Sequence, residues 1–288
     1  MVDDGRIRIL HQVALREPTM VAAWPGMGLV GFNAVEFLRA HLAAQQVAEI
    51  DPADFFSVAG IQIKEGLAAP LRIPSNTFHA WFNPAGPQDL LLFLGSSQPV
   101  GGREMALASL VLDVAERFQV KRLVTAAAMA SQIDHLAPSK VFGVCNHPDE
   151  VEALRKLGVQ LLQEGEVGGL NGLLIGVAQQ RGFRGSCLMG EMPHYTTHIE
   201  NPKASQAVLE VLCRMLSLTL DFAPLVERAR FIEAQIQSFL QAARTRGEQA
   251  EAGTESSESE ETPPAEEEED PGTESGSGAP GGGKAAIN

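Results

Sequence analysis

Residues 25–31 have the composition of a loop that binds phosphate. The pattern G-x-G-x-x-G, placed after an apolar run and before a helical pattern, is filled by Gly26, Gly28 and Gly31. Glycines let backbone amides approach a pyrophosphate, and the N-terminus of the following helix offers partial positive charge. An acid that binds a ribose is expected about 20 residues further on, where Glu49 and Asp51 lie. The loop is thus a candidate site for a nucleotide-like ligand, a dinucleotide in particular.

Two features favour a tight turn over a nucleotide site in this loop. Pro25 lacks an N–H group and stiffens the end of the preceding strand. The next predicted strand leads into a segment of antiparallel character, and not into the next strand–helix unit of a dinucleotide fold. We therefore expect the glycines to serve mainly the packing of strand against helix, and we expect no cofactor. A different anion or small ligand at the turn is the alternative.

Two further loops place polar side chains where predicted strands end or helices begin. Residues 95–102 carry Ser96 and Gln98 among glycines, but they lack the lysine and the spacing of a P-loop. Asn171 lies at a second junction, 168–172, where it is expected to cap a helix. Loops at the carboxyl ends of parallel strands share one edge of a sheet, which is where pockets form. These loops therefore join the glycine loop as candidates for one pocket.

Residues 190–195 contain the most reactive-looking set of side chains. Glu191 follows a predicted buried strand, with His194 and Tyr195 close behind it. A glutamate beside a histidine does general acid–base chemistry when both face a cavity. We expect instead that Glu191 accepts backbone amides and braces a turn fixed by Pro193. The candidate ligand pocket then comprises Gly26, Gly28, Gly31, Ser96, Gln98, Asn171, Glu191, His194 and Tyr195.

The other polar residues form no catalytic or metal-binding pattern. The spacing of His194 and His198 suits a metal on a helix, but Pro193 and two threonines argue against a helix there. No G-x-S-x-G elbow occurs. The three cysteines lie in apolar strands or helices without an activating neighbour, which indicates buried thiols in a reducing compartment: Cys145, Cys187 and Cys213. We predict no catalytic residue and no metal site, and favour a non-enzymatic role.

Charge is distributed unevenly along the 288 residues. The net charge is −14, and residues 247–288, with 12 acidic residues and one lysine, carry −11 of it. The rest of the chain is nearly neutral without a basic patch, and the acidic end repels phosphates, so we expect no binding to nucleic acid. No apolar run reaches about 18 residues, and the first residues are acidic, so we expect no membrane span, no secretion signal and a cytoplasmic location.

The candidate residues are set in an alternation of strands and helices. Apolar strand patterns occur at 19–24, 45–51, 89–94, 122–127, 141–145 and 185–189. Helical patterns occur at 29–42, 104–118, 148–157, 170–180 and 203–218. The stretch 55–82 has alternating apolar residues and strand formers, which indicates antiparallel strands. The alternation predicts one α/β domain over residues 1–246, with a mostly parallel sheet between helices.

The last predicted helix, 224–244, has a pattern of its own. Its apolar positions alternate in spacing between four and three residues, as in the seam of a coiled coil: Leu225, Ala229, Ile232, Ile236, Phe239 and Ala243. Three heptads fit docking on the chain's own domain, and they also fit contact with another subunit or partner helix. Residues 247–288 are rich in Glu, Ser, Pro and Gly, and we expect them to form a disordered acidic tail.

Five segments give the chain a resemblance to a known family. They are WPGMGLVGFNAVEFL at 24–38, FLGSSQP at 93–99, GLNGLLIG at 169–176, CLMGEMPHY at 187–195 and NPKASQAVLEVL at 201–212. By these segments the chain resembles the proteasome assembly chaperone 2 family, whose bacterial and archaeal members have often been labelled relatives of ATP-grasp ligases.

The resemblance implies a three-layer αβα sandwich similar to purine nucleoside phosphorylases, with a mixed, mostly parallel sheet. It also implies a scaffold that oligomerises, with a trimer as the first guess, or that holds proteasome-like or other protein subunits. The nucleotide-binding lysines and paired magnesium carboxylates of ATP-grasp enzymes are not found in the sequence. A ligase-type enzyme that uses residues 25–31 is therefore the alternative and not the preferred function. Archaeal relatives are expected to dock on proteasome rings through a terminal hydrophobic–tyrosine–any motif, whereas this chain ends Ala286-Ile287-Asn288.

Overall fold

The computed structural model describes residues 5–57 and 60–255, with side chains described as far as residue 246. The chain divides into two compact units, Met1–Phe239 and Leu240–Asn288. Of the predicted acidic tail, residues 247–255 continue the last helix, and residues 256–288, with the terminal residues discussed above, lie outside the described part.

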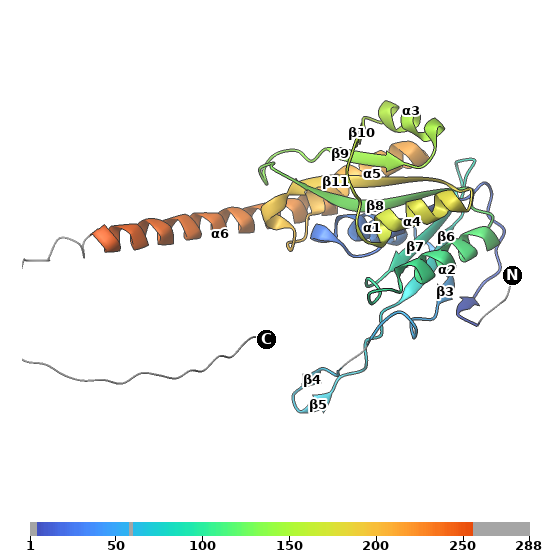
Figure 1. Ribbon diagram of the computed structural model, residues 1–288, viewed down its shortest axis with the longest axis horizontal. Coiled ribbons are helices and arrows are strands. Elements are labelled where there is room, and N and C mark those ends of the chain that lie inside the picture. Colours follow the sequence, from blue (N-terminus) through green and yellow to red (C-terminus); the bar gives the residue numbers. More distant parts are fainter. Residues whose placement is uncertain (1–4, 58–59, 256–288) are drawn as a thin grey trace, which may run out of the picture. The chain divides into compact units, whose positions relative to one another are not determined.

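Nine of the eleven described strands of unit Met1–Phe239 form one mixed sheet (Figure 1). Four parallel strands make its centre, in the order β7 (Leu90–Gly95), β2 (Thr19–Ala23), β8 (Arg122–Ser131) and β11 (Arg184–Pro193). Their carboxyl ends therefore meet at one edge of the sheet, called here the carboxyl edge. The prediction of a mostly parallel sheet holds for this centre.

Antiparallel strands complete the sheet on both sides. Beyond β7 lie β6 (Asn76–Trp81), β3 (Gln45–Ile50) and β1 (Ile7–Ile9), each antiparallel to its neighbour. Beyond β11 lies β9 (Val141–Cys145), antiparallel to β11 and parallel to the short β10 (Gln160–Leu161). The strand order makes the sheet mixed, with as many antiparallel as parallel pairings among the described strands.

Helices cover both faces of the sheet, because alternate side chains of the buried strands point to opposite faces. On β2, Met20 and Ala22 pack with α2 (Glu104–Arg117) and α4 (Gly169–Gln180). Val21 and Ala23 pack on the other face with α1 (Val30–His41) and α5 (Pro202–Leu216), near α3 (Pro148–Lys156) (Figure 1). Burial of each leucine or valine in these layers stabilises the fold by about 1.5–3 kcal/mol. No described helix combines the length and apolar character that a bilayer crossing requires.

Two strands run further than the sequence patterns predict. β8 continues to Ser131 through Ala-Met-Ala, residues without strand preference. β11 continues to Pro193 in register with it, so Glu191 lies within the strand and does not brace a turn after it, which corrects the prediction. Pro193 is tolerated because the pairing of β11 with β9 ends at Gly190, and its missing N–H removes no ladder bond on that side.

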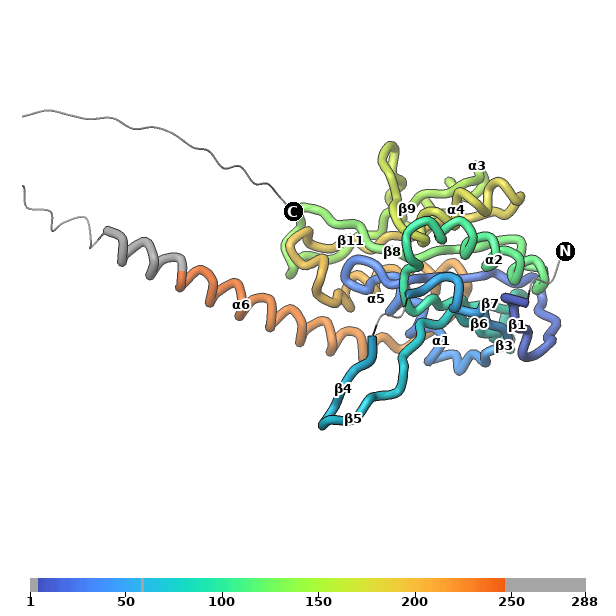
Figure 2. The backbone as a smooth tube through the Cα atoms, turned by 60° about the horizontal axis from the view of Figure 1, so that its bottom comes forward, coloured from blue at the N-terminus to red at the C-terminus, as the bar shows by residue number. Residues whose placement is uncertain are grey.

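The segment between β3 and β6 contains a separate antiparallel hairpin. β4 (Ile63–Lys64) and β5 (Leu67–Ala68) form a two-stranded sheet of their own, joined by a turn in which Glu65 and Gly66 have positive φ (Figure 2). Positive φ at both positions is the geometry of a type I′ turn. The prediction of antiparallel strands in residues 55–82 is therefore confirmed for β4, β5 and β6.

The last helix, α6 (Ala223–Glu255), extends past its predicted end. Residues 248–252 are Glu, Gln and Ala, which are good helix formers and carry the helix past Gly247. Ala229, Ile232 and Ile236 are each less than one tenth exposed, whereas Phe239 is 74% exposed. The predicted seam is therefore buried as far as Ile236, as expected for a helix that docks on its own domain.

A buried carboxylate holds the amino ends of β2 and β7. Asp89 accepts hydrogen bonds from the Arg16 guanidinium at 2.9 Å and from the backbone amides of Arg16 and Asn83 at 2.8 Å each. Burial by itself raises the pKa of Asp89, but the hydrogen bonds from Arg16 and Asn83 outweigh burial and lower the pKa below its ordinary value of 3.8. The ionised form therefore stabilises the fold.

Asp89→Asn is expected to lower the free energy of unfolding at pH 7 by about 2–3 kcal/mol, because it removes charge-assisted bonds to a buried group. A lowered pKa in the folded state means that this stabilisation is present above the ordinary pKa and is lost as the pH falls through the folded-state value. Urea unfolding at pH 7 and at about pH 3 should therefore show the gap between variant and native protein closing in acid. A gap of the same size at both pH values would contradict this role.

Candidate functional site

Trp24 and Asn171 join two segments far apart in sequence at the carboxyl edge. Trp24 follows β2, is fully buried and packs against Phe93, with the ring centroids 4.7 Å apart and the ring planes tilted by 52°. The Asn171 side chain accepts a hydrogen bond from the Trp24 amide at 2.9 Å and donates one to the Trp24 carbonyl at 3.1 Å. Asn171 was predicted to cap α4, but Gly168 holds the cap position and Asn171 lies inside the first turn. Asn171 instead holds the backbone of Trp24, just after β2, through these two hydrogen bonds.

The glycine loop is built for close packing. Gly28 has φ +58°, and a Cβ there would lie 2.7 Å from the Met192 side chain. Gly31, in the first turn of α1, would place a Cβ 1.9 Å from the carbonyl oxygen of Ala126 in β8. The Gly28 amide donates to the Thr197 carbonyl at 2.8 Å, and the Leu29 amide donates to the Gly26 carbonyl at 3.0 Å. These two amides are thus committed to backbone partners, which supports the packing interpretation.

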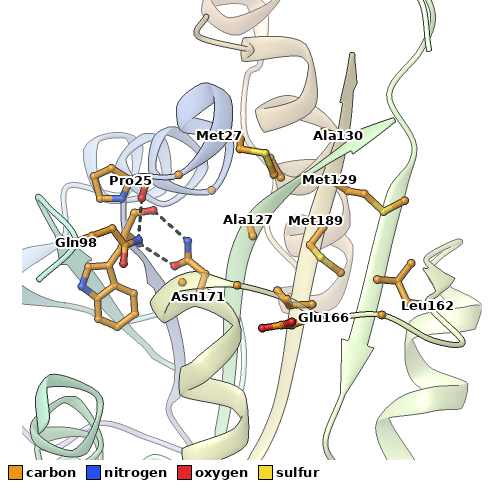
Figure 3. Close-up of a pocket in the computed structure, with 18 of the residues that line it drawn as sticks. Pro25, Met27, Gln98, Ala127, Met129, Ala130, Leu162, Glu166, Asn171 and Met189 are labelled. Atoms are coloured by element: carbon orange, nitrogen blue, oxygen red, sulfur yellow. Dashed lines mark hydrogen bonds between the residues drawn. The ribbon is translucent and has the colours of Figure 1, made fainter. Parts of the chain in front are cut away.

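A cavity of about 650 Å³ lies beside this loop, between the ends of β8 and β11 and the start of α4. Figure 3 shows Met27, Met129, Met189 and Leu162 around it, with Asn171 and Gln98 at one side. Gln98 donates to the Pro25 carbonyl at 2.8 Å and accepts from the Leu170 amide at 3.4 Å. Both amide side chains therefore already have backbone partners, and the rest of the wall is mainly apolar.

The rim of the cavity is acidic. Glu164 and Glu166 are exposed on the loop before α4 and belong to the lining, whose described residues include no lysine or arginine. The N-terminus of a helix such as α4 carries about half a positive charge, which two carboxylates outweigh. The site therefore disfavours a phosphate and suits an apolar group with a basic flank.

The cavity collects four of the nine predicted pocket residues: Gly26, Gly31, Gln98 and Asn171. Gly28 packs against the Met192 side chain and is not among the lining residues, and Ser96 exchanges hydrogen bonds with Ser75 next to β6. One Glu191 oxygen accepts from the Ser131 hydroxyl at 2.8 Å, while the other is buried without a partner among the described residues.

His194 and Tyr195 lie on the surface just beyond β11, in the short helix η2 (His194–Thr196), whereas Glu191 is buried within β11. The Tyr195 hydroxyl accepts a hydrogen bond from the His135 amide at 2.9 Å. Glu191 and His194 both contact Ser131, Glu191 through the hydroxyl and His194, at 3.3 Å, through the carbonyl oxygen. The acid–base pair considered for them stays a prediction.

Exposed apolar side chains occur on the loops of the carboxyl edge and on the part of α6 that is linked to them. We call this set the edge patch; its members are 40–54% exposed and are Met27, Leu29, Leu136, Tyr195, Ile199 and Phe231. Backbone hydrogen bonds between Gly28 and the 197–201 loop hold that loop against the glycine loop 25–31. Arg228 links α6 to the same loop, since it pairs with Glu200 at 2.9 Å and lies 5.6 Å from the centre of the Phe231 ring.

Comparison with known proteins assigns the family. The family model described as the PAC2 family matches residues 20–240, more than three quarters of the chain. The chain belongs to the PAC2 family. The predicted resemblance to the proteasome assembly chaperone 2 family is thereby confirmed.

Solved structures and a curated protein show how far the PAC2 likeness extends. PbaB of Pyrococcus furiosus, described as an archaeal proteasome activator, is 25% identical with a TM-score of 0.71, covering 81% of this chain and 97% of that one. PbaA of the same organism, described as an archaeal homolog of proteasome-assembly chaperone, is 22% identical with a TM-score of 0.64, covering 87% and 98%. An uncharacterized protein of Methanocaldococcus jannaschii, MJ1210, is 24% identical over 228 residues, covering 77% of this chain and 83% of its own.

Two of the three cysteines of this PAC2 chain are buried. Burial raises the pKa of the Cys187 and Cys213 thiols to about 11, so both are protonated at neutral pH. Among the described residues, no group of three or more His, Cys, Asp and Glu side chains is arranged to hold a metal ion.

Most of the residues that line the cavity beside the glycine loop were not predicted from the sequence. They are apolar or lie on a loop without a motif: Met27, Ala127, Ala128, Met129, Ala130, Leu162, Glu164, Glu166, Val167 and Met189. The one sequence signal was Met27, a large apolar residue inside a glycine turn. What the chain offers at its carboxyl edge is thus a mainly apolar cavity and an exposed apolar patch that shares Met27 with it.

Proposed function

We propose that this PAC2 chain is a non-enzymatic, self-associating scaffold that acts through protein–protein contacts. The observation that carries the proposal is the edge patch, where six large apolar side chains stay 40–54% exposed and one of them, Met27, also lines the cavity. Contiguous apolar surface rimmed by polar groups marks interaction sites on soluble proteins. A trimer is the first guess for the assembly, and proteasome-like or other protein subunits are the expected further partners.

The relatives support protein partners. PbaB, described as a proteasome activator, shares the fold along 81% of this chain. An activator of a proteasome acts on another protein, so transfer of that role by similarity favours a protein-binding surface here. The nucleotide-binding or ligase-type alternative is less favoured, because the Gly28 and Leu29 amides are committed and the cavity rim is acidic.

Replacing Phe231 in the edge patch tests the proposal. Phe231→Asp puts a charge in place of a side chain that is 53% exposed. If this surface is buried on association, we expect the dissociation constant of the oligomer to rise about 10- to 100-fold, the equivalent of one buried apolar side chain. Sedimentation equilibrium over a range of protein concentrations measures the constant.

Met105→Asp is the matched control, because Met105 is 52% exposed but lies on α2, which packs on the face of the sheet opposite α1 and α5. Native protein and control should associate equally. A native chain that stays monomeric up to its solubility limit would refute the self-association, and equal effects of the two substitutions would refute the assignment to this surface.

A further inference from the structure

The β4–β5 hairpin, residues 60–73, carries apolar side chains that the rest of the chain does not cover. They are 53–74% exposed: Ile61, Ile63, Leu67, Leu71 and Ile73. Each strand has only two residues, and the two strands form a sheet of their own. A two-stranded hairpin is marginally stable in water and gains order by packing its apolar face on another surface. We therefore expect the hairpin to pack its apolar side chains against a partner surface.

The hairpin leaves the body at the carboxyl edge, where the cavity lies. It follows β3 and precedes β6, and the end of β3 pairs with the start of β6 at Ile50 and Asn76. Asn76 in turn pairs with Gly95, the last residue of β7. β7 is parallel to β2, after which the cavity residue Trp24 follows. Hairpin and cavity thus belong to the same edge of the sheet.

The charges of the hairpin and of the cavity rim are complementary. Lys64 and Arg72 outnumber Glu65 on the hairpin, and Glu164 and Glu166 stand on the rim. The side chains of Lys64, Arg72 and the two rim glutamates are all exposed, and none has a hydrogen-bond or ion-pair partner within the part of the chain that the structure describes. Opposite charges placed in this way select a partner and its orientation.

The cavity itself fits an aliphatic occupant. Its volume of about 650 Å³ accommodates several aliphatic side chains, and methionines, which adapt to varied shapes, line it at positions 27, 129 and 189. Its amide side chains at Gln98 and Asn171 are satisfied internally, so an occupant needs to offer them no polar group. An aliphatic segment with basic flanks matches both the wall and the rim.

We propose that the β4–β5 hairpin of a second copy of this chain docks in this cavity. Its aliphatic side chains would lie among Met27, Met129 and Met189, and Lys64 and Arg72 would pair with Glu164 and Glu166. Within one chain the hairpin side chains stay exposed, so the chain's own cavity does not cover them, and the match of basic hairpin to acidic rim favours the cavity of another copy. The inference rests on the proposed self-association and specifies one of its contacts.

Charge exchange between hairpin and rim tests the contact. Lys64→Glu with Arg72→Glu reverses the hairpin, and Glu164→Lys with Glu166→Lys reverses the rim. Each pair alone opposes like charges, and we expect self-association at least about 100-fold weaker than in the native chain. The chain with all four substitutions restores complementarity and should associate like the native protein. The two double variants, mixed in equal amounts, should form mixed species, detected by mass after labelling one of them.

The outcomes separate the contact from the proposed function. All four positions are exposed, and equal melting temperatures of the variants check that the fold is kept. Double variants that associate like the native chain would overturn the hairpin contact, whereas the Phe231→Asp result would still stand. Rescue in the fourfold variant without mixed species would place the contact within one chain and also overturn it. A monomeric native chain would refute the self-association itself.

Discussion

Gly31→Ala is expected to lower the free energy of unfolding by about 3 kcal/mol or more, the upper end of the range for overpacking a core. The added Cβ would lie 1.9 Å from the Ala126 carbonyl oxygen and 2.8 Å from the Ala127 amide nitrogen, and both atoms belong to the backbone of β8. A strand in the centre of the sheet has no room to retreat, because β2 and β11 hold it on both sides. Thermal unfolding should show a melting temperature lower by about 6–12 °C.

Gly176→Ala is the matched control for Gly31→Ala. Gly176 also lies inside a helix, α4, but nothing lies within 4 Å of the position of its added Cβ. Alanine there gains helix propensity, so the control should gain up to about 1 kcal/mol. Equal losses at both positions would show that the close approach of α1 to β8 is not what requires Gly31. The contrast also separates packing from ligand binding, because it is measured on the protein alone.

Asn171→Ala is expected to cost about 2–5 kcal/mol. The side chain is 5% exposed and satisfies both the amide and the carbonyl of Trp24. Alanine leaves these two buried backbone groups without partners, and each such loss costs about 1–3 kcal/mol. Urea unfolding followed by tryptophan fluorescence measures the effect, since the bonds are made by Trp24 itself.

Gln98→Ala is the control for Asn171→Ala. Gln98 also bonds backbone groups in the same cavity, to Pro25 and Leu170, but it is only half-buried, so water can replace its bonds. We expect a loss of at most about 1 kcal/mol. A larger loss at Gln98 than at Asn171 would show that the cavity wall is held by the 95–102 loop and not by the clamp on Trp24.

The central strands and helices were predictable because their signals are local. Thr19–Ala23 and Leu90–Gly95 are short apolar runs bounded by turn residues, and their burial on both faces follows from that composition. The ends of β8 and β11 were not predictable, because Ala-Met-Ala and Gly-Glu-Met-Pro gain their extended form from pairing with each other. Pairing between residues 62 positions apart leaves no pattern in a single sequence.

The candidate site was predictable only where glycines and amides mark it. Gly26, Gly31, Gln98 and Asn171 were found from motif positions at strand ends, and they do share the cavity. The predicted role of Asn171, a helix cap, was wrong. The sequence shows that Asn171 lies at the start of a helix, but it does not show its partner Trp24, which is 147 residues away. Met129 and Met189 were missed because an apolar side chain in a strand gives no sign of whether it meets another side chain or a cavity.

The burial of α6 sets where this protein can be shortened. Ala229, Ile232 and Ile236 cover part of the apolar interior of their own domain. A chain that ends near residue 220 would expose that interior and precipitate, whether or not the full chain forms oligomers. Loss of assembly in such a fragment would say nothing about subunit contacts. Crystallographers who wish to remove the acidic end should cut after Phe239, where the buried side of the helix has ended.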